Sequence, residues 1–215
     1  MRTRRLAGAI AHRAAILAFG ADLRFALALA VREPGRVSGI FGCSASLPGL
    51  DARQYERMGK WHRFILANAR YAPRILPFLV RSGFALARGI GKESFFRAVN
   101  AGSPADMRTF SDPAIRDAIL MGSDICLGPQ HSAHDAFARE CIDSETDWSD
   151  LVHACPVPVR LLQGGEDPQT PAETVRERMP AFPTLDVEIV ENAGQLVFFQ
   201  EWPRVLDELE RMLPR

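Results

Sequence analysis

The chain has 215 residues, of which 47% are hydrophobic and 24% are charged. This length accommodates one domain with an inserted subdomain, and this share of apolar residues excludes a disordered polar chain. The 26 Lys and Arg residues balance the 26 Asp and Glu residues. Bulk electrostatics therefore imply neither direct nucleic-acid binding nor a membrane partner.

The cysteines are widely spaced along the chain, at Cys43, Cys126, Cys141 and Cys155. They form no CxxC pair, and none stands at zinc spacing with a histidine. Reduced, buried thiols in a cytoplasmic protein explain them most simply, because cytosolic thiols are kept reduced. The pattern implies neither a metal nor a cofactor.

Residues 1–11 open with arginines followed by apolar residues, as a signal or transit peptide does. His12, Arg13, Asp22 and Arg24 then interrupt the apolar runs before any reaches the ~20 residues that a membrane span needs. A helix followed by a strand explains this segment better than a targeting sequence does.

Residues 1–46 and 154–215 have an α/β texture, in which short apolar runs alternate with helical patterns. The predicted strands cover residues 14–19, 37–41, 157–163 and 185–190. The first run is almost entirely apolar, as expected for a strand covered by helices on both faces. Helices predicted at 23–32 and 203–213 follow strands, so right-handed crossovers and a parallel sheet are expected.

Residues 47–153 carry helical patterns and no convincing strand, which predicts a helical lid inserted between two core segments, 1–46 and 154–215. Predicted helices cover 51–72, 74–90 and 132–142, and two more begin at Ser103 and Asp112. Ser103 and Asp106 form a predicted capping box with Pro104 at the first helical position.

The most specific pattern lies near the C-terminus. A buried strand ends in Gly164-Gly-Glu-Asp167, with Pro171 four residues after the aspartate. The next strand leads into Glu191-Asn-Ala-Gly-Gln195, and Trp202-Pro203 opens an amphipathic helix. This order resembles the last two strands of the α/β-hydrolase family, which carry the acid (G-x-x-D-x-x-x-P) and the base (A-G-H). The resemblance implies that Asp167 occupies the acid position and Gln195 the base position.

The N-terminal part resembles the family's nucleophile elbow, G-x-S-x-G, and the helix that follows it. In the family a proline follows the nucleophile by about fourteen residues and precedes the next strand. Ala26, Ala30, Pro34 and Val37 fit that pattern, and counting back from Pro34 places the nucleophile position at Gly20.

A hydrolase triad needs a hydroxyl or thiol that attacks, an imidazole that takes its proton and a carboxylate that orients the imidazole. Gly20 offers no nucleophile, and the Gln195 amide is no base near neutral pH. Only the acid, Asp167, is retained. The resemblance therefore implies a hydrolase-like pseudoenzyme that binds a small apolar ligand or a partner. The alternative is an active esterase-like hydrolase with a non-standard site or a truncated N-terminus.

Asp22 is a second nucleophile candidate, since a carboxylate attacks in dehalogenase- and epoxide-hydrolase-like members of the family. The register Gly20-x-Asp22 leaves Pro34 two residues short and puts the large Arg24 where the backbone packs tightly. A solvated or capping carboxylate is the default interpretation of Asp22.

Three other polar residues carry weaker signals. Ser44 is followed by a loop, whereas an elbow requires an immediate helix. His131 and His134 lie three residues apart without a third metal ligand, so they are interpreted as solvated residues of the lid surface.

In the family about four strands precede the elbow strand, but here only about 13 residues do. The resemblance thus implies a partial α/β-hydrolase fold of four parallel strands in the order 1-2-3-4, flanked by helices. Its elbow strand would leave an apolar edge exposed, which pairs with a second copy or another partner, or aggregates. A truncated reading frame, a fragment of a longer polypeptide and a chain completed by a partner all stay open.

Overall fold

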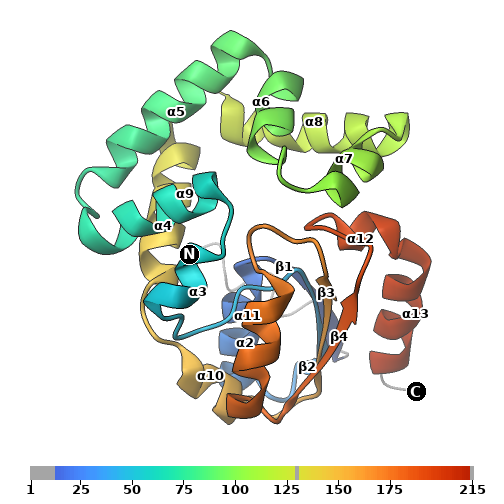
Figure 1. Cartoon of the computed structure of the whole chain (residues 1–215). Helices are drawn as coiled ribbons and strands as arrows, with labels where there is room; N and C mark the ends of the chain where they lie inside the picture. Colours follow the sequence, from blue (N-terminus) through green and yellow to red (C-terminus); the bar gives the residue numbers. More distant parts are fainter. Residues whose placement is uncertain (1–12, 129–130, 214–215) are drawn as a thin grey trace.

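The computed structural model describes residues 13–128 and 131–213. Residues 1–11, with their targeting-like pattern, lie outside this range, as do the side chains of Cys126 and His131. Four parallel strands form one sheet in the order β1-β2-β3-β4 (Figure 1). They are β1 (Ala14–Phe19), β2 (Val37–Cys43), β3 (Val159–Gly164) and β4 (Leu185–Val190). The predicted fold class and strand order are confirmed.

The strand bounds differ from the prediction only in the two central strands. β2 extends two residues further, to Cys43, and β3 begins two residues later, at Val159, and ends one residue later, at Gly164. Pro158 accounts for the later start, because it has no N–H to donate to the ladder. Its carbonyl oxygen still accepts a hydrogen bond of 2.9 Å from the Ile40 N–H.

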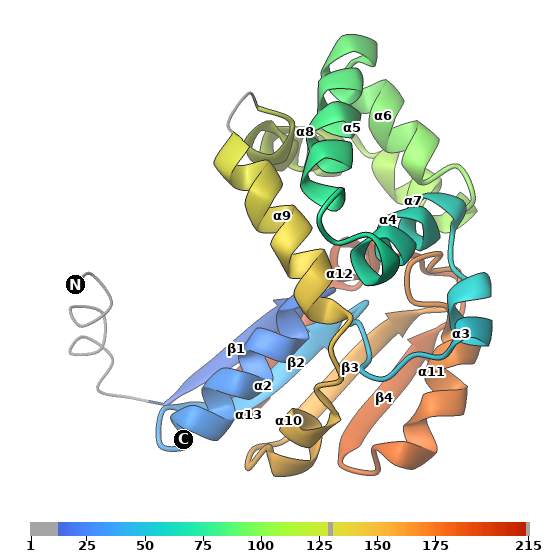
Figure 2. The same cartoon turned by 90° about the vertical axis from the view of Figure 1, so that its left-hand side faces the viewer.

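Helices cover both faces of the sheet (Figures 1 and 2). α2 (Asp22–Arg32), α10 (Ser149–Ala154) and α11 (Ala172–Arg178) lie on one face, and α13 (Trp202–Met212) lies on the other. Because side chains alternate along a strand, β2 contributes Ile40 to the core under α2 and Phe41 to the core under α13. β1 is an edge strand, and its first four residues are only half-buried.

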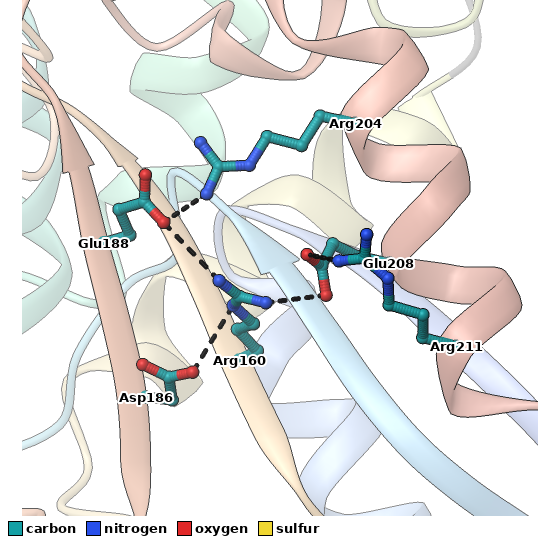
Figure 3. Close-up of polar contacts among 6 residues, drawn as sticks. All are labelled: Arg160, Asp186, Glu188, Arg204, Glu208 and Arg211. Carbon is teal, nitrogen blue, oxygen red and sulfur yellow. Dashed lines mark hydrogen bonds and ion pairs between the residues drawn. The ribbon is translucent and has the colours of Figure 1, made fainter.

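A network of ion pairs fastens α13 to β3 and β4 (Figure 3). Arg160 of β3 reaches Glu208 of α13 at 2.7 Å and Asp186 of β4 at 3.3 Å. Glu208 is buried and also pairs with Arg211 at 2.7 Å. The closing helix is thus held by charge pairing as well as by its apolar face.

A run of helices between β2 and β3 lies over the carboxyl ends of the strands (Figure 2). It has its own core, built around Leu76, Val80 and Phe84. We call residues 52–144 the helical insertion. Its helices are α3 (Ala52–Glu56), α4 (Lys60–Tyr71), α5 (Leu76–Ile90), α6 (Lys92–Val99), α7 (Pro104–Phe110), α8 (Pro113–Leu127) and α9 (His131–Ser144).

The region after the insertion packs with the sheet. Trp148 and Val152, at and within α10, belong to the core beneath α2. Two short elements complete the chain: a 3-10 turn at Met179–Ala181 and α12 (Val197–Gln200). The predicted division of the chain at residues 46/47 and 153/154 stays a prediction.

Two expectations for the insertion are wrong. The helix predicted at 51–72 is broken at residues 57–59. There the Gly59 N–H donates a hydrogen bond of 2.7 Å to the Pro168 carbonyl instead of to a carbonyl of α3. His134 is not solvated: it is 1% exposed, and its ring lies 5.0 Å from that of Phe84. The reason is that α5 packs along α9 and covers it.

Candidate functional site

A cavity of about 660 Å³ lies between the carboxyl ends of the strands and the helical insertion. Its floor includes Gly20 after β1, Ser44 after β2 and Gln195 after β4. Most of its opposite wall comes from α3, α4 and α9, which contribute Tyr55, His62, Leu66, Arg70, Phe137, Glu140 and Cys141. Residues at the carboxyl ends of parallel strands commonly form ligand sites.

Gly20 occupies the turn between β1 and α2. Its φ of 56° lies in the left-handed region that favours glycine. Its N–H donates to the Cys43 carbonyl at 3.2 Å, and its own carbonyl accepts from the Ser46 N–H at 3.0 Å. A Cβ added here would meet nothing within 4 Å. The turn therefore has room for a side chain, and the glycine leaves that room empty.

Asp167 lies behind the cavity floor and is 3% exposed. Its carboxylate accepts hydrogen bonds from the side-chain amide of Gln163 at 2.8 Å and from the N–H groups of Gln169 at 2.7 Å and Thr170 at 3.2 Å. Burial raises the pKa of Asp167 to about 6, and these hydrogen bonds oppose the rise. The Ser44 hydroxyl also lowers this pKa, although no hydrogen bond of standard geometry joins the two side chains.

Gln195 meets another amide. The Gln169 side chain donates a short hydrogen bond to Gln195 Oε1, and the Gln169 N–H donates to Asp167. Gln169 thus links the predicted acid position to the predicted base position. Neither amide can take up a proton near neutral pH, so this linkage holds the loops together without moving protons.

The loop that carries Gln195 is fixed by a carboxylate from the insertion. Asp106 of α7 is 0% exposed and accepts the N–H groups of Gln195 at 3.1 Å and Leu196 at 2.7 Å. Of the predicted capping box, the Ser103 hydroxyl does accept from the Asp106 N–H at 3.2 Å. The carboxylate that should complete the box instead accepts from this loop. A side chain at position 194 would collide with the Asp106 carboxylate, so only glycine fits there.

Asp22 is the first residue of α2 and lines the cavity. A carboxylate in the first turn stabilises a helix, because its negative charge interacts favourably with the positive end of the helix dipole. Its charge also acts across the cavity on Glu140 of α9: burial raises the pKa of Glu140, the Asp22 charge raises it further, and Arg24 opposes the rise. The nucleophile and capping interpretations of Asp22 both stay predictions.

Ser44 has a more unusual environment than its sequence context indicates. It has a positive φ of 46° and is 3% exposed. Ser44 lines the cavity, and its buried hydroxyl makes no hydrogen bond with any residue in the described ranges. A buried polar group without a partner and a non-glycine residue at positive φ both cost free energy, and such costs concentrate at binding sites.

The polar residues of the opposite wall could not be found from the sequence, because they come together from separate helices. The Tyr55 hydroxyl donates to both Glu145 carboxylate oxygens, at 2.8 and 2.7 Å. The Arg70 guanidinium lies 5.8 Å from the centre of the Tyr55 ring. Burial lowers the pKa of His62 to about 4, so this histidine is neutral at pH 7. Burial also raises the pKa of Cys141 to about 12, which leaves it a thiol.

Within residues 13–128 and 131–213, no three His, Cys, Asp or Glu side chains gather closely enough to hold a metal ion. The same residues include no helix that is both long and apolar enough to cross a bilayer. The thiols of Cys43, Cys141 and Cys155 are free.

No protein-family model matches the sequence, and neither does any curated protein sequence. Solved structures do resemble the chain. An esterase from Thermogutta terrifontis matches with a TM-score of 0.60 at 16% identity, covering 98% of this chain and 69% of its own. The α/β hydrolase MGS-M2 from a Medee basin deep-sea metagenome gives 0.60 at 13%, covering 98% and 68%.

An esterase from Rhodococcus sp. gives a TM-score of 0.59 at 15% identity, covering 96% of this chain and 66% of its own. Identities this low establish the fold and not the activity. The matches agree with the parallel sheet and its flanking helices. The chain therefore has a partial α/β-hydrolase fold, spanning about two-thirds of the length of the hydrolases it resembles.

Proposed function

We propose that the chain binds a small, largely apolar ligand in the cavity beneath the helical insertion and does not hydrolyse it through a Ser-His-Asp triad. The observation that carries this proposal is the cavity itself, with Gly20 and Gln195 on its floor. A volume of about 660 Å³ is typical of small-molecule sites. A glycine cannot attack a substrate, and a glutamine cannot accept the proton.

The lining sets the character of the ligand. Large apolar side chains supply much of it: Phe19, Phe25, Leu47, Leu50, Met58, Leu66 and Phe137. The unsatisfied Ser44 hydroxyl offers one hydrogen bond at the floor. A ligand with an apolar body and one neutral polar group would satisfy Ser44 and cover the apolar side chains without bringing a charge of its own into the cavity.

Titration with the fluorescent apolar probe N-phenyl-1-naphthylamine tests this proposal. We expect saturable binding of one probe per chain. Ser46→Phe adds a ring inside the cavity and should weaken binding at least ~10-fold. Ser111→Phe places the same ring on an exposed position of the insertion and should leave the affinity unchanged. Equal affinities for the two variants would show that the probe binds elsewhere.

An active esterase-like hydrolase is the second candidate, and the strained, buried Ser44 is the observation that favours it. A fluorophosphonate probe and a short-chain p-nitrophenyl ester separate the two candidates. The binding proposal predicts no labelled residue and no turnover. Labelling that Ser44→Ala removes, or turnover that Asp167→Asn abolishes, would establish the esterase reading in its place.

A further inference from the structure

One stretch in the first half of the helical insertion carries basic residues and no acidic ones. Residues 57–92 contain eight of the 26 Lys and Arg residues and none of the 26 Asp and Glu residues. The rest of the chain consequently carries an excess of negative charge. A net charge of zero therefore conceals a marked separation of charge, and α4 and α5 make up most of the basic part.

The same segment exposes large apolar side chains. On α5, Leu76, Val80, Phe84 and Ala87 are buried in the core of the insertion. The opposite side of this helix is also apolar, and there Phe78 is 68% and Leu86 is 67% exposed. Other large apolar side chains of the segment that are at least 37% exposed are Trp61, Phe64, Tyr71, Ile75 and Ile90. We call the exposed apolar side of α5, with its neighbours on α4, the α4–α5 face.

Arginines border this face at regular spacing. Arg81 and Arg88 stand seven residues apart, close to two helical turns, so they lie on one side of α5, and Arg74 stands seven residues before Arg81 in the turn that precedes the helix. α5 lies at the end of the molecule remote from the sheet (Figures 1 and 2). A helix with an exposed apolar stripe beside a basic row is typical of segments that lie in a membrane interface.

Acidic residues from neighbouring helices neutralise only part of this charge. Arg81 pairs with Asp135 of α9 at 2.6 Å, and Lys92 pairs with Asp124 of α8. Lys60, Arg63 and Arg74 are exposed, and in the described ranges no ion pair joins them to a carboxylate. The face thus keeps several positive charges beside its apolar side chains.

We infer that the α4–α5 face docks on an anionic phospholipid surface. The apolar side chains would enter the boundary between headgroups and acyl chains, and the basic residues would pair with the lipid phosphates. A second copy of the chain fits this face less well, because apposed copies would bring the same positive charges together. The inference is independent of the ligand cavity and departs from the expectation based on net charge.

Flotation with lipid vesicles tests the inference on the full chain. One set of vesicles is phosphatidylcholine alone, and the other contains about 30% phosphatidylglycerol. We expect binding to the anionic vesicles at least ~10-fold tighter than to the neutral ones, and weakening between ~0.1 M and ~1 M salt. Phe78→Ser/Leu86→Ser should lower anionic-vesicle binding at least ~10-fold. Leu206→Ser, an exposed leucine on α13, is the matched control and should bind as the wild type does.

Circular dichroism and the unfolding midpoint establish that each variant is folded. Lys60→Gln/Arg74→Gln leaves the apolar side chains intact and should also weaken binding to the anionic vesicles. Three results would overturn the inference. The first is equal binding to both kinds of vesicle, and the second is anionic-vesicle binding that Phe78→Ser/Leu86→Ser leaves unchanged. The third is a wild-type protein that is a dimer and a Phe78→Ser/Leu86→Ser variant that is a monomer, since a second copy would then cover the face.

Discussion

The two sides of the cavity floor are built in opposite ways. On the β3–β4 side, Asp106 and Asp167 are buried, and their carboxylates satisfy the N–H groups of the loops that follow the strands. On the β1–β2 side, Gly20 leaves open space and the Ser44 hydroxyl makes no hydrogen bond in the described ranges. On the first side, Asp106 joins the insertion to a loop of the sheet. The second side keeps open space and an unsatisfied group, and under the proposed function it is where a ligand would bind.

Of the changes that test this contrast, removing the carboxylate of Asp106 should lower the unfolding free energy most. Asp106→Ala leaves the buried Leu196 N–H and the partly buried Gln195 N–H without acceptors, and we expect it to lower the unfolding free energy by about 3 kcal/mol. Asp112→Ala removes an exposed N-cap of α8 and should cost only about 1 kcal/mol. Urea unfolding of both variants measures the difference, and similar losses would mean that Asp106 does not tie the insertion to the sheet.

Asp167 should make stability depend on pH. Burial raises its folded-state pKa from 3.8 to about 6, so the folded state binds this proton more tightly than the unfolded state does. The contribution of Asp167 to the unfolding free energy should fall by about 2–3 kcal/mol as pH rises from about 4 to about 7. Asp167→Asn removes this titration.

The difference in unfolding free energy between the wild type and Asp167→Asn, measured at both pH values, isolates that contribution from other titrating groups. An Asp186→Asn variant, altered at an exposed acid on β4, serves as the control. A difference that is the same at both pH values would show that the Asp167 carboxylate is not destabilised by its burial.

A substitution on the β1 side of the cavity floor should change the unfolding free energy least. Gly20→Ala meets no steric obstacle, so its cost comes from the positive φ alone and should be about 1 kcal/mol. Gly89→Ala on α5 also adds a methyl group to open space, without a positive φ, and should instead stabilise by about 0.5–1 kcal/mol. Thermal unfolding of the pair checks the opposite signs, and a large loss for Gly20→Ala would mean that the turn is not open.

Much of the fold could be predicted from local sequence. The bounds of β1 and β4 agree with the prediction because β1 is a short apolar run, β4 alternates apolar and acidic residues over a short stretch, and both end at turn residues. The break between α3 and α4 could not be predicted, since Met58 and Trp61 continue the helical spacing across it. What interrupts the helix is the hydrogen bond from Gly59 to Pro168, more than a hundred residues away.

The candidate site divides in the same way. The positions of Gly20, Asp167 and Gln195 follow from motif spacing, and the first and third line one cavity. The roles inferred for them stay predictions. Tyr55 and Glu145 are 90 residues apart, and neither belongs to a motif, so no sequence pattern could pair them. The strain at Ser44 depends on how β2 passes into the loop beside β3, which is also a tertiary property.

The sequence by itself determined the four strands, the parallel α/β class and the lack of a side chain at residue 20, because each follows from residue type and local spacing. The tertiary structure alone decided that Asp106 serves the Gln195 loop instead of its own helix cap, and that His134 is buried. It also decided that α5 shows an apolar side to solvent. Contacts between distant segments set burial, and burial determines which polar groups need partners and which apolar groups still lack cover.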